Sequence, residues 1–203
     1  LGIANILFHL EALEIVAASG YGTRMGIATL SLLISIIGGR IVPSFTNNWF
    51  ARHGLQRVAL QHSKIDGICH GTSLIALTAW IALPFEQVTG ITLLVAAVAH
   101  AVRWLQWFGW RTLGEPLVLI LHIGYAWIPI GFAILGLAIL FDVGVLSAGV
   151  HALTVGAIGT MTLAVMTRAT LGHTGRALHA GRATIALYAA VSVAVGLRIA
   201  AVF

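Results

Sequence analysis

The sequence predicts an all-α protein: a single domain over residues 1–203, built as a polytopic bundle of about seven transmembrane helices. Its composition supports this, because 59% of the residues are hydrophobic and only 8% are charged, whereas an average soluble domain has about 25% charged residues. The charges also lie between apolar runs of about 17 to 25 residues, the length that crosses a bilayer as a helix. The lipid bilayer is therefore an expected partner. Nucleic acid is not, since the 11 Lys and Arg residues form no dense basic run.

Polar breaks and Gly- or Pro-containing breaks divide the chain into seven apolar segments, which are the expected membrane helices in order. They cover residues 1–18, 23–39, 67–83, 88–108, 116–140, 147–167 and 182–203. The one long connection, 40–66, carries Pro43 and a polar run at 46–48, which predicts an interfacial loop with a short amphipathic helix. Its basic side chains are expected to face lipid headgroups; they are Arg52, His53, Arg57, His62 and Lys64.

Basic residues follow alternate helices, and this pattern predicts the orientation of the bundle. Connections rich in Lys and Arg tend to stay on the cytoplasmic side, so we expect 40–66, 103–115 and 168–182 to face the cytoplasm. The turns at 84–88 and 141–146 contain neither residue and are expected on the outer side. The chain begins at Leu1 without an initiator Met or a preceding basic segment, so we expect it to be part of a longer protein.

The supply of possible metal ligands is dominated by histidine. Cys69 is the only cysteine among 203 residues, so a covalently attached c-type haem and a thiolate cluster are excluded. Four of the nine histidines fall in predicted loops, where a headgroup-facing position is the simplest interpretation: His53, His62, His173 and His179. The other five fall within predicted helices, where an ionisable side chain is costly and by default marks function: His9, His70, His100, His122 and His151.

Two of these histidines are predicted at matched depth. His100 lies about seven residues before the inner end of the fourth helix, and His122 about six residues after the inner start of the fifth. At about 1.5 Å per residue both are about 10 Å deep. Consecutive helices run antiparallel, so the two imidazoles are candidates for the axial pair of a b-type haem.

Cations and indoles accompany this pair. Arg103 shares a helix face with His100, and Arg111 lies just beyond it, so either is a candidate partner for a haem propionate. An alternative interpretation is an aromatic belt with snorkelling arginines. The belt would consist of Trp104, Trp107 and Trp110.

Other polar groups leave several roles open. The sixth segment has a small-residue surface that permits close approach of a helix or a flat ring, with His151 near its outer end. His9, in the first segment, is a candidate ligand of a second centre. Glu11 and Glu14 beside it fit a proton route, metal ligands or the end of the helix. Three methionines could contribute to a soft Cu(I) site, although packing is their commoner role: Met25, Met161 and Met166.

Three stretches carry a family resemblance. Residues 151–176 read HALTVGAIGTMTLAVMTRATLGHTGR, residues 39–50 read GRIVPSFTNNWF, and residues 103–127 read RWLQWFGWRTLGEPLVLILHIGYAW. The first closely resembles the signature of the NnrS family of bacterial membrane proteins, and the other two agree with it. Family proteins are about twice as long, so this chain is similar to their C-terminal half, and the N-terminal half of the same protein becomes an expected partner.

The resemblance extends to individual positions, which are Arg40, Pro43, Thr46, Asn47, Asn48, Trp107, His122, Tyr125, Trp127, His151, Thr154, Gly156, Gly159, Thr162, Met166, Thr167, Arg168, Thr170, Gly172, His173 and Arg176. It implies a haem- and copper-containing, multi-pass protein of the bacterial inner membrane, associated with nitric oxide metabolism and resistance to nitrosative stress. By family pattern His122 and His151 are the strongest ligand candidates.

The expected cofactors are haem b and, as a second one, copper, and nitric oxide is the expected small-molecule partner. The combined candidate ligands are His122, His151, His100 and His9. Two alternatives stay open. Intramembrane His and Glu, together with a helix discontinuity at 129–131, also describe a proton-coupled transporter. A structural or sensory subunit fits the lack of a catalytic constellation, so enzyme activity is left undecided.

Overall fold

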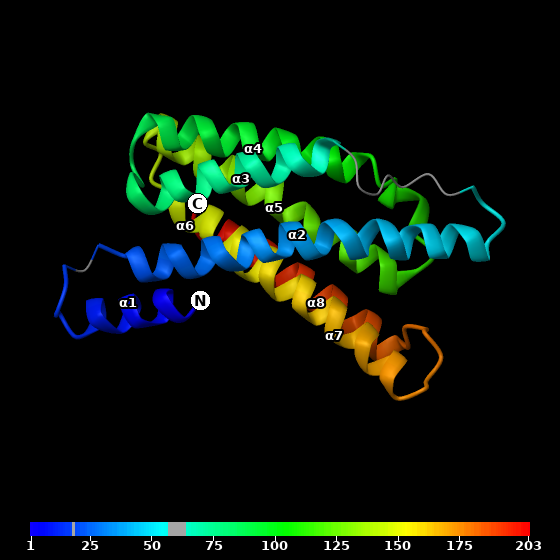
Figure 1. Ribbon diagram of the computed structural model, residues 1–203. Coiled ribbons are helices and arrows are strands. Elements are labelled where there is room, and N and C mark those ends of the chain that lie inside the picture. The colour runs from blue at the N-terminus through cyan, green and yellow to red at the C-terminus, as the bar shows by residue number, and fades with distance from the viewer. Residues whose placement is uncertain (18, 57–63) are drawn as a thin grey trace.

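The computed structural model describes residues 1–17, 19–56 and 64–203, and all regular secondary structure in these residues is helical. Figure 1 shows a bundle of long helices with a short helix, α1, beside the start of α2. The elements are α1 Gly2–Ala12, α2 Tyr21–Arg52, α3 Lys64–Ala82, α4 Gln87–Leu105, η1 Gly109–Thr112, α5 Pro116–Phe141, α6 Leu146–His151, η2 Ala152–Gly159, α7 Thr160–His173 and α8 Arg182–Ala200. The predicted all-α fold class is confirmed.

Six helices in the described residues are long and apolar enough to cross a membrane: α2, α3, α4, α5, the continuous rod Leu146–His173 and α8. The protein is therefore a multi-pass membrane protein. The first predicted helix is shorter than expected, because α1 has 11 residues and spans about 16 Å, against about 30 Å for a hydrocarbon core.

Glu11, in the last turn of α1, connects this helix to the start of α2. Its carboxylate accepts hydrogen bonds from the backbone N–H groups of Tyr21 (2.7 Å) and Gly22 (3.2 Å), which are the first two residues of α2. The first N–H groups of a helix have no partner within it, so Glu11 caps α2 from the preceding helix. Gly22 permits the close approach, since a Cβ there would collide with the backbone of Phe8. Of the roles open for Glu11, the structure shows this one, whereas Glu14 is exposed.

The predicted interfacial loop at 40–66 is wrong over its first half. Helix α2 continues to Arg52, through Pro43. Pro43 and the polar residues after it are typical of a turn, but here they are held by packing: the Thr46 hydroxyl donates to the Val42 carbonyl (2.8 Å). Residues 57–63, with the expected headgroup-facing Arg57 and His62, lie outside the described residues.

The sixth membrane segment contains a wide-turned π-helix, η2, between α6 and α7. Small residues on this rod pack directly on α5, since a Cβ on Gly149 would lie 2.5 Å from Leu135 Cγ, and one on Gly156 would lie 2.6 Å from Trp127 Cγ. The predicted close-approach surface is therefore confirmed, with a helix rather than a ring against it.

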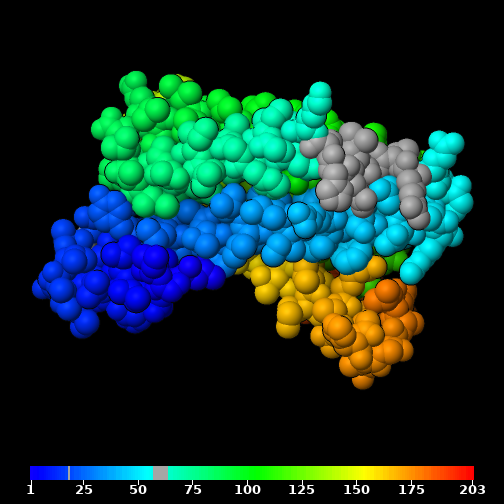
Figure 2. Space-filling model, in the orientation of Figure 1, coloured from blue at the N-terminus to red at the C-terminus, as the bar shows by residue number. Residues whose placement is uncertain are grey.

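The three cation-rich connections lie at one end of the bundle. Figure 1 shows the end of α2, the η1 region and the α7–α8 turn on the same side, opposite α1. In Figure 2 the α7–α8 turn, in orange, lies below the end of α2 in the view. One small cleft is lined from all three connections, by Arg52, Glu115 and Arg168 among others. This grouping agrees with the predicted orientation, and the cytoplasmic assignment of that end stays a prediction.

Candidate functional site

An ion pair between buried Arg103 and partly exposed Asp66 lies near the end of α4, and the contacts of Arg103 join four helices. The Arg103 guanidinium pairs with Asp66 of α3 at 2.5 Å, and its Nη1 donates to the Ser35 carbonyl of α2 (2.9 Å) and to the Tyr125 hydroxyl of α5 (2.9 Å). The Arg103 residue is 1% exposed. Gly39 makes the space, because a Cβ there would fall on the guanidinium. Arg103 therefore fixes the mutual positions of α2, α3, α4 and α5.

The hydrogen bonds continue from this ion pair to His100. His100 Nδ1 lies 2.8 Å from Tyr125 Oη, and its Nε2 lies 2.7 Å from Ser73 Oγ on α3. Tyr125 Oη already accepts from Arg103, so its own proton is available to His100 Nδ1, and His100 Nε2–H then donates to Ser73. The series Asp66, Arg103, Tyr125, His100 and Ser73 is called the polar chain below.

His122 occupies a separate site closer to the end of α2. Its Nε2 lies 2.8 Å from Thr46 Oγ1, and the side chain is buried. Its Nδ1 is also buried and has no hydrogen-bond partner among the described residues. The face of the His122 ring packs on the turn that follows α4, since a Cβ on Gly109 would lie 2.5 Å from Nδ1 and 2.6 Å from Cγ.

Indole rings surround this site in two different ways. Trp104 Nε1 donates to the His122 carbonyl (2.9 Å), and the Trp107 ring is buried, with its centroid 6.3 Å from that of His122 and 4.6 Å from that of Tyr125. Trp110 is exposed. Trp107 is thus a core residue. It does not lie at the membrane surface as a residue of the predicted aromatic belt would.

The predicted haem pair, His100 and His122, stays a prediction. Both nitrogens of His100 have hydrogen-bond partners, so haem ligation by His100 would have to displace Ser73 or Tyr125. The rings of Trp107 and Tyr125 also pack among these residues. Of the two histidines, only His122 has a ring nitrogen without a partner in the described structure. His122 therefore offers one ring nitrogen to a metal, and His100 offers none in this packing.

The other candidate residues lie apart from this pair. His151, half-buried, ends α6, and the packing of its neighbours against α5 puts it roughly ten residues along α5 from His122, about 15 Å. His9 is exposed on α1 beside the start of α2, about 35 Å along that helix from Thr46. Arg111 is exposed, with its guanidinium carbon 5.1 Å from the Phe50 ring centroid. The structure therefore brings Arg103 to His100, but not Arg111, His9 or His151.

Sequence reasoning assigned no contact to the four residues that hold these imidazoles and the guanidinium, namely Thr46, Ser73, Tyr125 and Asp66. Thr46 and Tyr125 are among the family-like positions, and this was the one feature of the sequence that could have marked them as site residues. In the described residues no group of three or more His, Cys, Asp or Glu side chains could hold a metal ion. A complete coordination sphere therefore needs more than the side chains gathered here.

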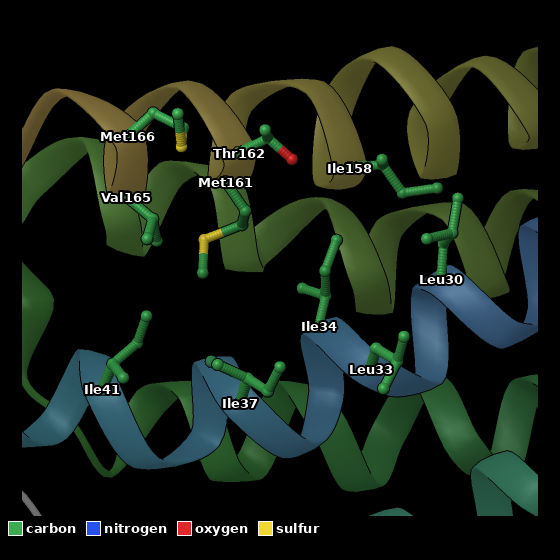
Figure 3. A pocket seen from close by; sticks show the side chains of 11 residues that line it. Leu30, Leu33, Ile34, Ile37, Ile41, Ile158, Met161, Thr162, Val165 and Met166 are labelled. Atoms are coloured by element: carbon green, nitrogen blue, oxygen red, sulfur yellow. The ribbon is translucent and has the colours of Figure 1, made fainter. Parts of the chain in front are cut away.

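Figure 3 shows an apolar groove between α2 and α7, with a volume of about 230 Å³. Met161 and Met166 line it together with aliphatic side chains such as Leu30 and Ile37. Met161 is buried against Gly38 and Gly124, and no histidine lines the groove. Met161 therefore has a packing role here, whereas Met166 is exposed.

Comparison with known proteins gives one match. A family model described as NnrS protein matches residues 1–203, the whole chain. No curated protein and no solved structure matches the chain.

Proposed function

Since this chain belongs to the NnrS family, we propose that it is a haem- and copper-containing protein of the bacterial inner membrane that takes part in nitric oxide metabolism or in protection against nitrosative stress. The family match and the six membrane helices support a multi-pass membrane protein of this family. The finer role depends on a group that can hold a metal at membrane depth.

The observation that carries the proposal is the imidazole of His122. Metal ligation needs a neutral imidazole with one nitrogen free and the other held by a hydrogen bond that fixes the ring. His122 meets both conditions, because Thr46 contacts Nε2 while Nδ1 has no partner among the described residues. Trp107, whose ring centroid lies 6.3 Å from that of His122, is buried as well.

A bound haem or copper would supply an open coordination position and one-electron chemistry for nitric oxide. His122 would be one protein ligand, and Thr46 would hold its ring in place. The remaining ligands come from groups beyond those that gather in the described residues, and the expected N-terminal half of the protein is our proposed source.

A second candidate function is a proton-coupled transporter, and the polar chain favours it. His100, Tyr125 and Ser73 are joined by hydrogen bonds of 2.7 and 2.8 Å inside the membrane helices, where such groups often mark proton paths. The same contacts also serve to hold α3, α4 and α5 together.

Purified full-length protein in detergent separates these functions. We expect a Soret band that shifts when nitric oxide is added, and copper above background by elemental analysis. Cells lacking the protein should grow more slowly under a nitric oxide donor. A colourless, copper-free protein that couples proton movement to a solute in reconstituted vesicles would overturn the proposal in favour of the transporter.

A further inference from the structure

We propose that the polar cleft at the cation-rich end of the bundle binds the phosphate of an anionic phospholipid, and that the groove beside it, between α5 and α8, holds one acyl chain of that lipid. The cleft is lined by Arg52 of α2 and Arg168 of α7, with Glu115 at the start of α5. Neither His122 nor any residue of the polar chain lines the cleft or the groove. The inference is therefore separate from the proposed function and needs no metal.

Arg168 supplies the guanidinium on which the cleft depends. Its side chain is half-buried, and its guanidinium carbon lies 4.1 Å from the centroid of the Phe45 ring of α2. A guanidinium over a ring keeps its in-plane N–H groups available, and their fork matches the oxygens of a phosphate. Neither a hydrogen bond nor an ion pair joins this guanidinium to another described residue. Its donors are therefore free to bind an anion.

The charges that line the cleft leave one net positive charge. Arg52 and Arg168 contribute two positive charges, and Glu115, which lies within electrostatic reach of Arg168, contributes one negative charge. The Glu115 carboxylate is also engaged at the start of α5, where it accepts from the backbone N–H of Leu117 (3.3 Å). A phosphodiester carries one negative charge and so neutralises the cleft, whereas a choline headgroup would bring a further cation to it.

The cleft also lies at a depth that lipid phosphates reach. Arg168 is five residues before the end of α7 at His173, about 8 Å along the helix. The headgroup layer on each side of a bilayer is about 5 to 8 Å thick. Basic pockets between membrane helices bind the headgroups of anionic lipids, and this cleft has the same chemistry between α2, α5 and α7.

The groove between α5 and α8 leads from this end of the bundle toward the membrane interior. It has a volume of about 210 Å³, and its walls are mainly aliphatic, with Ile123 of α5 and Ile185 of α8 among them. It begins at Pro116, the residue after Glu115, and reaches Ile123, a distance of about 10 Å along α5. An acyl chain is the apolar group that a bilayer supplies at this depth.

Tyr188 connects the groove with the cleft. It lines the groove, and it interacts electrostatically with Arg168 and Glu115, which line the cleft. Among the described residues of α8, Tyr188 and Val195 are the buried ones, so lipid rather than protein covers most of this helix. A lipid whose phosphate binds Arg168 can therefore place one chain in the groove.

Native mass spectrometry of the delipidated full-length protein measures lipid binding directly. The protein in detergent is titrated with dioleoylphosphatidylglycerol or with dioleoylphosphatidylcholine, and inorganic phosphate is added as a competitor. We expect the anionic lipid to bind about tenfold more tightly than the zwitterionic one, and phosphate not to displace it. Equal binding of the two lipids would overturn the proposal, because the cleft would then select no charge. Displacement by phosphate would also overturn it, since the cleft would then take a soluble phosphate compound.

Charge-matched variants locate the phosphate. Arg168→Gln should weaken binding of phosphatidylglycerol about tenfold, the equivalent of one charged hydrogen bond. Arg52→Gln, at an exposed position that does not affect packing, should weaken it as well. Arg176→Gln removes the same charge from the exposed α7–α8 turn outside the cleft and should change the affinity by less than about twofold. Equal losses in the three variants would mean that only total charge matters, and the cleft would be rejected as the site.

A second pair of variants tests the groove. Ala189 lines it, whereas Ala190, the next residue of α8, is exposed and does not. Ala189→Leu fills part of the groove and should weaken phosphatidylglycerol binding severalfold, while Ala190→Leu, with the same added side chain, should match the wild type. Unchanged affinity in Ala189→Leu would overturn the placement of the acyl chain between α5 and α8.

Discussion

Replacing Tyr125 by Phe should destabilise the bundle by about 2 kcal/mol. The change removes only the hydroxyl, which accepts from Arg103 Nη1 at 2.9 Å and lies 2.8 Å from His100 Nδ1, so two buried groups lose a partner. Leaving a buried group unsatisfied costs about 1–3 kcal/mol in soluble proteins, but hydrogen bonds between membrane helices average only about 0.6 kcal/mol, with a maximum near 1.7. Because Arg103 is charged and both groups are at most 1% exposed, we expect values near that maximum for the two bonds combined.

Tyr188→Phe is the matched control. Tyr188 is also buried in a membrane helix, but its hydroxyl has no hydrogen-bond partner in the described part of the chain, so its removal should change stability by less than about 0.5 kcal/mol. Reversible unfolding in mixed micelles with increasing SDS measures both changes. If the two variants lost the same free energy, the polar chain would contribute nothing to the stability of the bundle, and the energetic reasoning above would be refuted.

Three further outcomes follow from packing and charge. Gly39→Ala should lower the melting temperature strongly, because its Cβ would fall on a buried guanidinium, while Gly26→Ala in the same helix, with open space around it, should be neutral or stabilise by up to about 1 kcal/mol. Glu11→Ala should cost about 1–2 kcal/mol by the loss of a helix cap, measured in the same micelle assay, and replacement of exposed Glu14 should not. A cysteine at exposed Thr174 should react with a membrane-impermeant reagent in inside-out vesicles; reaction in intact spheroplasts instead would invert the predicted topology.

The fold was predictable to the extent that the bilayer determines it. The length of each apolar run predicted where a membrane helix lies. The fifth was predicted at 116–140 and is observed at Pro116–Phe141. Its start was predictable because Pro is favoured at the first position of a helix. The error at 40–52 has a different origin. Pro43 and Thr46 resemble a turn locally, and the buried hydrogen-bond partner of Thr46, His122, is 76 residues away in sequence. A contact over that separation leaves no local signal.

The candidate site was predictable in depth but not in direction. Counting residues from helix ends put His100 and His122 inside the bundle, and both side chains are buried. The direction in which each ring points depends on the rotation of its helix and on the groups opposite it. Ser73 and Thr46 are ordinary residues of membrane helices, so their role as imidazole partners became visible only once the helices were packed. For the same reason the pairing of Arg103 with Asp66 was not predicted, and the role of Arg103 beside a propionate stays a prediction.

The π-helix Ala152–Gly159 determines which face α7 turns toward its neighbours relative to α6. In an α-helix each residue rotates the chain by about 100°, whereas a π-helix rotates more slowly because its bonds reach five residues back. The segment therefore changes the rotation of α7 about the helix axis relative to α6. The small residues of α6 face α5, while Met161 and Met166 of α7 face α2. A π-segment accommodates one extra residue, so a deletion here that restores an ordinary α-helix would leave α7 facing α2 much as before. A deletion in an α-helical part of the rod would instead turn everything after it by about 100°.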